Sequence, residues 1–361
     1  KTASLSSIRF QIQDKERRNT YKMTMPGRFT IQRFLKRAVG TGCTHVVLEV
    51  TSEGILQHRH RFLNFHTAVF TNLSPEHLER HGSFENYRAA KGKLFQTAKG
   101  VHIINADDAE AGYFLQFPAE QKYLYTIKGS EVTKDHAKVL RAVDVQSSAE
   151  GVSFQVDATA IQLKLIGFFN VYNALAAVCA GLSQGIALEV CKKALEKMTG
   201  VPGRMELVIR EPFKVFVDYA FTPAALEKVY QTLKKNSKLI CVLGAAGGGR
   251  DKWKRPVLGK IAAAYCDHVI ITDEDPYDEN PQQIIEQVFE GTQGRAEKIL
   301  DRREAIRKAL SLAQPGDTVI ITGKGSEDSI AVAGGKKIPW DDREVVKAEF
   351  QKIEEAGLPQ L

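Results

Sequence analysis

Short apolar runs of β character, each followed by a stretch with helical spacing, recur along this chain. In the first half they include HVVLEV (residues 45–50) and TAVFTNL (67–73). In the second half they are KVFVDYA, KLICVLG, DHVIITD and DTVIITG. Strands that alternate with helices indicate parallel sheets joined by right-handed crossovers. The pattern therefore predicts an α/β fold, and 361 residues are enough for two domains.

A different pattern separates the two halves. Short alternating runs between residues 138 and 166 predict a small antiparallel sheet, and two helices are expected at 171–184 and 187–198. The segment GVPGRMELV that follows marks a boundary between domains. We therefore expect one domain over residues 1–203 and a second over residues 204–361.

Composition narrows the class of protein. The net charge of +7 fits either a soluble surface or attraction to phosphorylated, carboxylated substrates, and no Lys/Arg run is long enough to indicate nucleic-acid binding. The five cysteines are scattered among apolar residues, which is typical of reduced thiols in a cytoplasmic protein. No stretch is apolar and long enough to span a membrane, and no signal peptide is visible. We expect a cytoplasmic monomer that binds neither nucleic acid nor membrane.

Polar residues follow the first two strands of the predicted sheet. Glu49 and Asn72 each come at the end of an apolar run. In open α/β sheets, ligands bind beyond the carboxyl ends of the strands, so we expect these two side chains side by side. A strand-end carboxylate such as Glu49 suits magnesium, although a solvated glutamate is the plainer interpretation. His77 and His81 are four residues apart, which on a helix would form a pair typical of metal ligands.

Lys91 is the unusual residue of this region. It falls on the apolar stripe of an expected helix, together with Phe84, Tyr87 and Leu94. Burial among such residues lowers the pKa of a lysine, and the neutral amine can react with carbon dioxide to form a carbamate, an anionic oxygen ligand. The alternative is a lysine whose stem packs on the core while its amine reaches water.

Motifs in order along nearly the whole chain resemble the Mur ligases, which add amino acids to the UDP-N-acetylmuramoyl peptide of bacterial cell wall. The motifs are EVTSEG, TNLSPEHLERHG, YRAAKGKLF, GFFNVYNALAA, GVPGRME, DYAFTP, GGGRDKWKRP and GKGSEDSI with DDRE. The tripeptide-synthetase (MurE) type is the most similar branch. The resemblance implies a central ATPase domain, with a mostly parallel sheet and a small antiparallel one, followed by a Rossmann-like C-terminal ligase domain.

The resemblance also implies roles for residues of the first domain. Glu49, His77 and carbamylated Lys91 match the residues that hold magnesium ions, and His77 and Lys91 are then catalytic. Thr51, Gln57 and Arg59 match residues that hold the uridine-muramoyl substrate; an arginine suits an anionic ligand. His81 is expected to be structural, and His58 and His60 have no matched role.

Four further residues are implied at the nucleotide. Asn170 and Asn173 lie in the motif that the family places near adenine, although asparagines at a helix start also serve as caps. Arg204, at the expected domain junction, would clamp the transferred phosphate when the domains close, and counts as catalytic. Asp218 resembles the family's nucleotide-contacting aspartate. The family often reads DYAHTP, whereas this chain has Phe221 at the histidine position.

The incoming amino acid is expected to meet Arg250, Gly323 and Glu327. Arg250 ends a glycine-rich turn that also invites a nicotinamide interpretation. The G-x-G-x-x-G order is not met, and no acidic residue follows in a clear ribose-binding context. In the family this arginine binds the amino acid, and a carboxylate such as Glu327 can bind an ammonium group.

The expected selector of the amino acid departs from the family pattern. Enzymes that add meso-diaminopimelate carry D-N-P-R, whose arginine holds the distal carboxylate. Here the stretch reads Glu274-Asp275-Pro276-Tyr277. Two acids without the arginine favour a side chain that ends in a cation, such as lysine, although Tyr277 leaves the choice open.

A Mur ligase should carry G-x-x-x-x-G-K-[ST], a loop whose backbone N–H groups hold phosphates, and this sequence has none. Because ASLSSIRF has β character, Lys1 is placed on the strand after that loop. We expect an N-terminal domain and the loop to be missing, and residues 1–361 alone to be inactive. The predicted function is an ATP- and Mg²⁺-dependent ligase that forms an amide between a UDP-N-acetylmuramoyl peptide and an amino acid. The alternatives are a related ligase such as folylpolyglutamate synthase, or a non-catalytic nucleotide-binding scaffold.

Overall fold

The computed structural model describes residues 1–21, 23–130, 137–148, 150–234 and 237–355. The chain forms two compact units. The first contains residues 1–142 and 175–188, and the second contains residues 143–174 and 189–361. Among the described residues, no helix is long and apolar enough to cross a membrane.

A four-stranded sheet begins the first unit, in the order β3-β2-β1-β4. Strands β1 and β4 run parallel, with Ala3 opposite Val46, whereas β1, β2 and β3 pair antiparallel. Helix α1 covers this sheet through buried Ile31, Phe34 and Ala38. The strand bounds are β1 Thr2–Leu5, β2 Arg9–Ile12, β3 Lys15–Arg18 and β4 His45–Leu48.

A six-stranded sheet follows in the order β10-β9-β8-β7-β6-β5. Strands β5 to β8 are parallel neighbours, and β9 and β10 form an antiparallel hairpin. The segment 138–166 therefore extends the main sheet instead of forming a small sheet of its own, which corrects the expectation from sequence. The bounds are β5 Thr67–Phe70, β6 Val101–Asn105, β7 Gln121–Thr126, β8 Lys138–Ser147, β9 Val152–Val156 and β10 Thr159–Leu163.

Helices α2 and α4 of this region begin at polar side-chain caps. The Thr51 hydroxyl accepts a hydrogen bond from the backbone N–H of Gly54, and the Ser83 hydroxyl accepts one from Asn86. Such caps satisfy backbone N–H groups that have no partner inside the helix. The helices are α1 Arg28–Gly40, α2 Ser52–Leu56, α3 Leu78–His81, α4 Phe84–Thr97, α5 Ala111–Leu115, α6 Phe169–Ser183 and α7 Leu188–Glu196.

The C-terminal sheet has the order β11-β12-β16-β13-β14-β15. Its strands run parallel except for β11, which pairs antiparallel at the edge. The predicted second parallel sheet is therefore confirmed; β11 adds an antiparallel edge strand to it, and β17 and β18 form a separate two-stranded sheet. The bounds are β11 Glu206–Ile209, β12 Lys214–Asp218, β13 Leu239–Leu243, β14 His268–Ile271, β15 Glu297–Lys298, β16 Thr318–Thr322, β17 Ser329–Val332 and β18 Lys336–Pro339.

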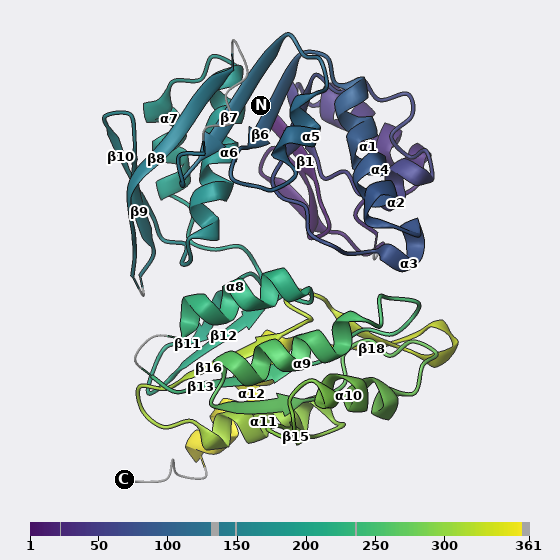
Figure 1. The fold of residues 1–361 in the computed structure, drawn as a ribbon, viewed down its shortest axis with the longest axis vertical. Coiled ribbons are helices and arrows are strands. Elements are labelled where there is room, and N and C mark those ends of the chain that lie inside the picture. The colour runs from purple at the N-terminus through teal and green to yellow at the C-terminus, as the bar shows by residue number, and fades with distance from the viewer. Residues whose placement is uncertain (22, 131–136, 149, 235–236, 356–361) are drawn as a thin grey trace. The chain divides into compact units, whose positions relative to one another are not determined.

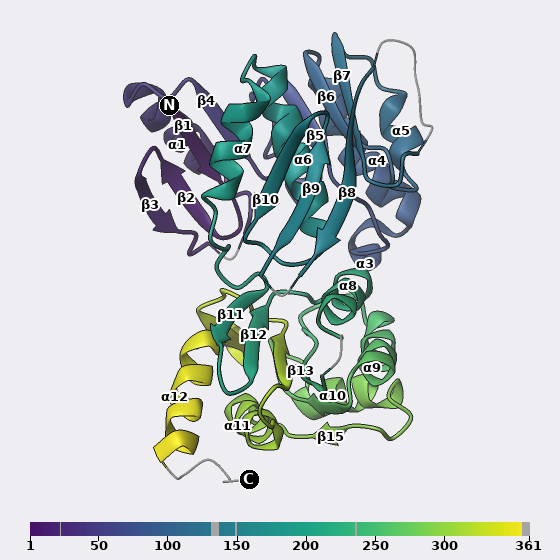
Figure 2. The ribbon, with the colours of Figure 1, turned by 90° about the vertical axis from the view of Figure 1, so that its left-hand side faces the viewer.

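Helices cover both faces of this sheet. Residues of α8, α9 and α10 pack in one apolar cluster on one face, and residues of α11 and α12 pack in another on the opposite face. Figure 1 shows α8 and α9 over the strands, and Figure 2 shows α12 and α9 on opposite sides of β12 and β13. The helices are α8 Pro223–Leu233, α9 Lys254–Tyr265, α10 Pro281–Glu290, α11 Arg302–Leu312 and α12 Asp342–Glu355.

Candidate functional site

Lys91 lies on α4 with its amine over the ring of Tyr87, 5.2 Å from the ring centroid. Among the described residues, no side chain forms an ion pair or hydrogen bond with its Nζ. Burial lowers the pKa of Lys91, and the negative charge of Glu49 acts in the opposite direction. The lowered pKa agrees with the predicted loss of lysine hydration, and Lys91 as a whole is half-buried. The favourable interaction with Glu49 places two of the expected metal ligands in one neighbourhood.

Two histidines lie around the same tyrosine. The His81 ring is 5.1 Å from the Tyr87 ring, and its Nε2 is 3.1 Å from the Ser52 hydroxyl. His77 is 5.8 Å from that ring, but it precedes α3 in a left-handed conformation (φ 58°) instead of lying within a helix. The two histidines therefore do not share one face of a helix, because α3 spans only residues 78–81. The packing of His81 fits its expected structural role.

Glu49 is exposed at the end of β4, where its Oε2 accepts a hydrogen bond of 2.8 Å from the backbone N–H of Ser7. Strand β4 pairs with β1, and β5, which precedes Asn72, pairs with β6 in the other sheet. The expected adjacency of Glu49 and Asn72 on one sheet edge is therefore not found. In the part of the chain that the structure describes, no group of three or more His, Cys, Asp or Glu side chains is placed to hold a metal ion.

The expected muramoyl-binding residues lie on and after α2. Thr51 caps this helix with its hydroxyl, and Gln57 ends it as an exposed residue. The guanidinium of Arg59 donates to the backbone carbonyl of Met25 and lies 3.3 Å from the sulfur of Met23. Arg59 therefore holds the segment before α1 against the turn after α2.

The paired asparagines open α6. The side-chain amide of Asn170 donates to the carbonyl of Ile166 at 2.8 Å, and the amide of Asn173 donates to Asn170 Oδ1 at 3.0 Å. These bonds tie the first turn of α6 to the preceding loop, but in them neither asparagine accepts from a backbone N–H, as a helix cap would.

Arg204 lies just before β11 with its guanidinium 4.3 Å from the centre of the Tyr219 ring. Tyr219 in turn meets Phe221 edge to face, at 5.0 Å between ring centres. Asp218, at the end of β12, accepts 2.7 Å bonds from the backbone N–H groups of Met205 and Ala220. These two bonds hold the backbone around Arg204 in place. Burial raises the pKa of the Asp218 carboxyl.

Lys324 is the residue that sequence reasoning missed. It is fully buried, and its Nζ lies 2.8 Å from Asp275 Oδ1 and bonds Glu327 Oε2. Asp275 Oδ1 also accepts 2.6 Å from the backbone N–H of Ala331. Two of the three carboxylates expected at the amino acid, Asp275 and Glu327, are thus held by one lysine, which the position between two glycines in GKGSE after a buried strand could have indicated.

Asp275 is therefore not the free acid that the sequence interpretation assumed, because its charge is matched by Lys324. Glu274 is the contrasting neighbour: it is buried, and its Oε2 has no hydrogen-bond partner among the described residues. Burial raises the pKa of Glu274 to about 7. Nearby Arg302 is also buried, but its charge is balanced by Asp342 at 2.7 Å.

The glycine-rich turn packs against the Glu274–Tyr277 stretch. A side chain at Gly247 would meet the carbonyl of Pro276 at 2.2 Å, and one at Gly248 would meet the Tyr277 ring at 2.6 Å. The guanidinium of Arg250 lies 5.7 Å from the centre of that ring. Arg250 and Tyr277, both expected at the amino acid, therefore lie together, and close backbone packing explains the glycines without a dinucleotide.

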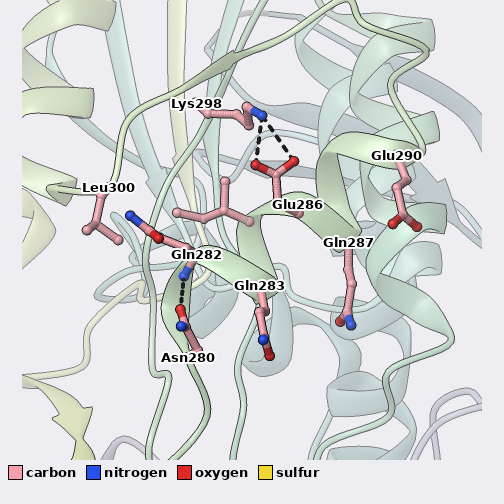
Figure 3. Close-up of a pocket in the computed structure, with 9 residues that line it drawn as sticks. Asn280, Gln282, Gln283, Glu286, Gln287, Glu290, Lys298 and Leu300 are labelled. Atoms are coloured by element: carbon pink, nitrogen blue, oxygen red, sulfur yellow. Dashed lines mark hydrogen bonds and ion pairs between the residues drawn. The ribbon is translucent and has the colours of Figure 1, made fainter.

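A surface groove of about 720 Å³ lies elsewhere in the second unit, along α10 and β15 (Figure 3). Lys298 and Glu286 form an ion pair of 2.8 Å across it. None of the predicted site residues lines the groove. Its lining residues are Asn280, Gln282, Gln283, Ile285, Glu286, Gln287, Glu290, Lys298 and Leu300.

Comparison with known proteins gives consistent results. The Mur ligase middle domain matches residues 1–181, and the Mur ligase glutamate ligase domain matches residues 203–325. The UDP-N-acetylmuramoyl-L-alanyl-D-glutamate–2,6-diaminopimelate ligase of Caldanaerobacter subterraneus is 41% identical over 342 residues, which cover 91% of this chain and 69% of that protein. The UDP-N-acetylmuramyl-tripeptide synthetase of a Roseiflexus species is 36% identical over 371 residues, covering 94% and 71%.

Solved structures agree. A UDP-N-acetylmuramoyl-L-alanyl-D-glutamate–2,6-diaminopimelate ligase superposes with a TM-score of 0.61 at 32% identity, covering 98% of this chain and 73% of that one. Folylpolyglutamate synthase of Mycobacterium tuberculosis has a TM-score of 0.62 but only 18% identity, covering 92% and 73%, so that likeness concerns the fold alone. Motifs, fold and relatives thus lead to one conclusion: the chain belongs to the Mur ligase family.

Proposed function

We propose that this chain is part of an ATP-dependent ligase that adds an amino acid to a UDP-N-acetylmuramoyl peptide during peptidoglycan precursor synthesis. The observation that carries the proposal is Lys91, whose amine is buried over Tyr87 without an ion-pair partner among the described residues. Such an amine is prone to be neutral, as carbamate formation requires. The names of the relatives point to the same reaction class.

The residues around Lys91 fit magnesium. Mg²⁺ takes oxygen ligands, commonly one or two carboxylates completed by substrate phosphate and water. Glu49 offers one carboxylate, a carbamate on Lys91 would offer another anionic oxygen, and His77 would add a nitrogen. Magnesium bound there would neutralise charge on the ATP phosphates.

The chain's own residues then have distinct tasks. The substrate carboxylate attacks the γ-phosphate of ATP and gives an acyl phosphate, which the amine of the amino acid attacks to form the amide and release phosphate. The cationic Arg204, held over Tyr219 at 4.3 Å, stabilises negative charge on the transferred group. Asn170, Asn173 and Asp218 position the nucleotide, and Thr51, Gln57 and Arg59 position the muramoyl peptide.

The second unit supplies the amino-acid site. Arg250 binds the α-carboxylate, while Gly323 and Glu327 face the ammonium group. Tyr277 stands where D-N-P-R has its arginine, so the side-chain pocket lacks that cation. We therefore infer a preference for L-lysine over meso-diaminopimelate, with Glu274 and Asp275 contributing negative potential despite the pairing of Asp275 with Lys324.

We also propose that the domain boundary lies between residues 203 and 204. The protein is further proposed to be a cytoplasmic monomer. Family matches that end at residue 181 and begin at residue 203 support this boundary. The five cysteines are free thiols, as expected in a reducing compartment.

The test is an assay of the full-length gene product with UDP-N-acetylmuramoyl-L-alanyl-D-glutamate, ATP, Mg²⁺ and single amino acids. We expect ADP and phosphate in equal amounts, and a nucleotide product heavier by one amino-acid residue. Glu49→Gln should remove this activity, whereas Glu286→Gln, in the groove along α10, should retain it. ATP binding without ADP formation under all conditions would support the non-catalytic scaffold instead.

A further inference from the structure

The ammonium group of the incoming amino acid must lose a proton before the amide bond can form. An amino group that is protonated at neutral pH has no lone pair with which to attack an acyl phosphate. A carboxylate within hydrogen-bond reach can take this proton, provided that it has no cation of its own. Glu274 is a described carboxylate in the amino-acid region that meets this condition.

Glu274 follows β14 at the carboxyl end of the C-terminal sheet, where ligands bind in α/β folds. Its side chain is 4% exposed, and its Oε2 is buried without a hydrogen-bond partner in the described structure. A buried acceptor left unpaired costs about 1–3 kcal/mol, and more when it is charged. A hydrogen bond from a bound ligand would remove that penalty.

The glycine at position 323 places this oxygen against the predicted amino-acid site. Gly323 has φ 107°, and a Cβ there would lie 2.3 Å from Glu274 Oε2. Any other residue at this position would therefore collide with the carboxylate. Because Gly323 is also expected to contact the amino acid, Oε2 lies where the ammonium group is to be bound.

The charges around Glu274 leave it without a dedicated partner. Lys324 is bound by Asp275 and Glu327, and Arg302 by Asp342. Burial and the charges of Asp275 and Glu327 raise the pKa of Glu274 to about 7, against the opposing effect of Lys324 and Arg302. A proton acceptor works best when its pKa lies near the operating pH.

We propose that the Glu274 carboxylate accepts the proton that the incoming ammonium group loses before the amine attacks the acyl phosphate. The inference rests on the proposed ligase function. One N–H bond breaks and an O–H bond forms on Glu274. The nitrogen lone pair then forms the C–N bond, the C–O bond to phosphate breaks, and phosphate leaves with that electron pair. The second nitrogen proton passes to water.

Hydroxylamine separates this step from acyl-phosphate formation, because it is largely neutral at pH 7.5 and needs no base to attack. The full-length Glu274→Gln protein should form hydroxamate from UDP-N-acetylmuramoyl-L-alanyl-D-glutamate and ATP at the unaltered rate. Amide formation with L-lysine should fall by about 10²–10⁴-fold. If the unaltered protein gives neither hydroxamate nor amide, the ligase function itself fails, which is a separate result.

The dependence on pH provides a second measurement. In the unaltered protein, kcat should rise as Glu274 ionises near pH 7. In Glu274→Gln this rise should be lost, and amide formation should recover toward pH 10 as free amine becomes available. Glu274→Asp should keep part of the rise, and Glu286→Gln should match the unaltered protein. Equal losses of hydroxamate and amide, or full amide formation by Glu274→Gln at pH 7.5, would overturn the proposal.

Discussion

Lys91 and Lys324 are two lysines with buried amines, one in each compact unit, and their surroundings give them opposite properties. Lys324 lies between Asp275 and Glu327, and the pKa of its amine is raised despite complete burial. Lys91 has an aromatic ring beneath it and only a more distant favourable charge from Glu49, and the pKa of its amine is lowered. Burial by itself disfavours a charged lysine, so the amine stays charged where carboxylates bind it and tends to be neutral where none does.

The largest expected effect comes from removing the reactive lysine. Lys91→Ala in the full-length gene product should lower ligase turnover on the order of 10³-fold, because phosphoryl transfer loses charge stabilisation. Short carboxylic acids should restore part of the activity by replacing the carbamate. The measurement is ADP release together with product mass. Full activity of the alanine variant would return Lys91 to the role of a lysine that packs on the core.

Substitutions of Lys324 and of Lys91 should have different effects on the free energy of unfolding. Lys324→Met leaves buried Asp275 and partly buried Glu327 without their cation, so unfolding of its unit should require about 3–5 kcal/mol less. Both tryptophans, Trp253 and Trp340, lie in that unit, so fluorescence in urea reports on it selectively.

Lys91→Met is the matched comparison, followed by circular dichroism. Because it removes a buried amine that has no ion-pair partner among the described residues, the urea midpoint should stay the same or rise. If Lys324→Met and Lys91→Met lowered the urea midpoint equally, the two lysines would not differ in their ion pairing as described.

Glu274 should lower the stability of the folded protein as pH rises above about 4.5. Its folded-state pKa of about 7 lies above the ordinary 4.5, so the folded protein holds a proton that the unfolded chain loses first. Stability is therefore full below about pH 4.5 and falls as pH rises toward 7. Glu274→Gln should exceed the unaltered protein by about 3 kcal/mol at pH 8 and match it near pH 4.5. A pH-independent difference would show that Glu274 is not protonated as described.

The smallest effect concerns the choice of amino acid. A distal carboxylate without a cationic partner costs about 1–3 kcal/mol, or roughly a tenfold to hundredfold loss of preference. The full-length gene product should therefore favour L-lysine over meso-diaminopimelate when both are present at equal concentration, as read from product masses. Tyr277→Arg should shift the ratio toward meso-diaminopimelate. Predominant incorporation of meso-diaminopimelate by the unaltered protein would show that Arg250 or a neighbouring lysine replaces the missing charge.

Much of the fold could be predicted, because apolar periodicity reflects burial directly. The second parallel sheet and the β character of residues 2–5 were predicted correctly. The helical pairing of His77 and His81 that was considered from their spacing does not occur, because His77 adopts a left-handed conformation before α3. The β9–β10 hairpin is part of the six-stranded sheet. Whether a strand joins one sheet or another depends on contacts between residues distant in sequence, which a local pattern does not reveal.

Sequence alone determined the strand ends at which Glu49 and Glu274 lie, the helix that carries Lys91 and the glycines at which the chain turns. Those features depend on local periodicity and on φ angles that few residues adopt. Only the tertiary structure decided that Asp275 is bound by Lys324 while Glu274 is not, and that Tyr87 lies beneath Lys91. A side chain's charge state depends on its burial and on partners brought from distant segments, so it emerges only when the chain has folded.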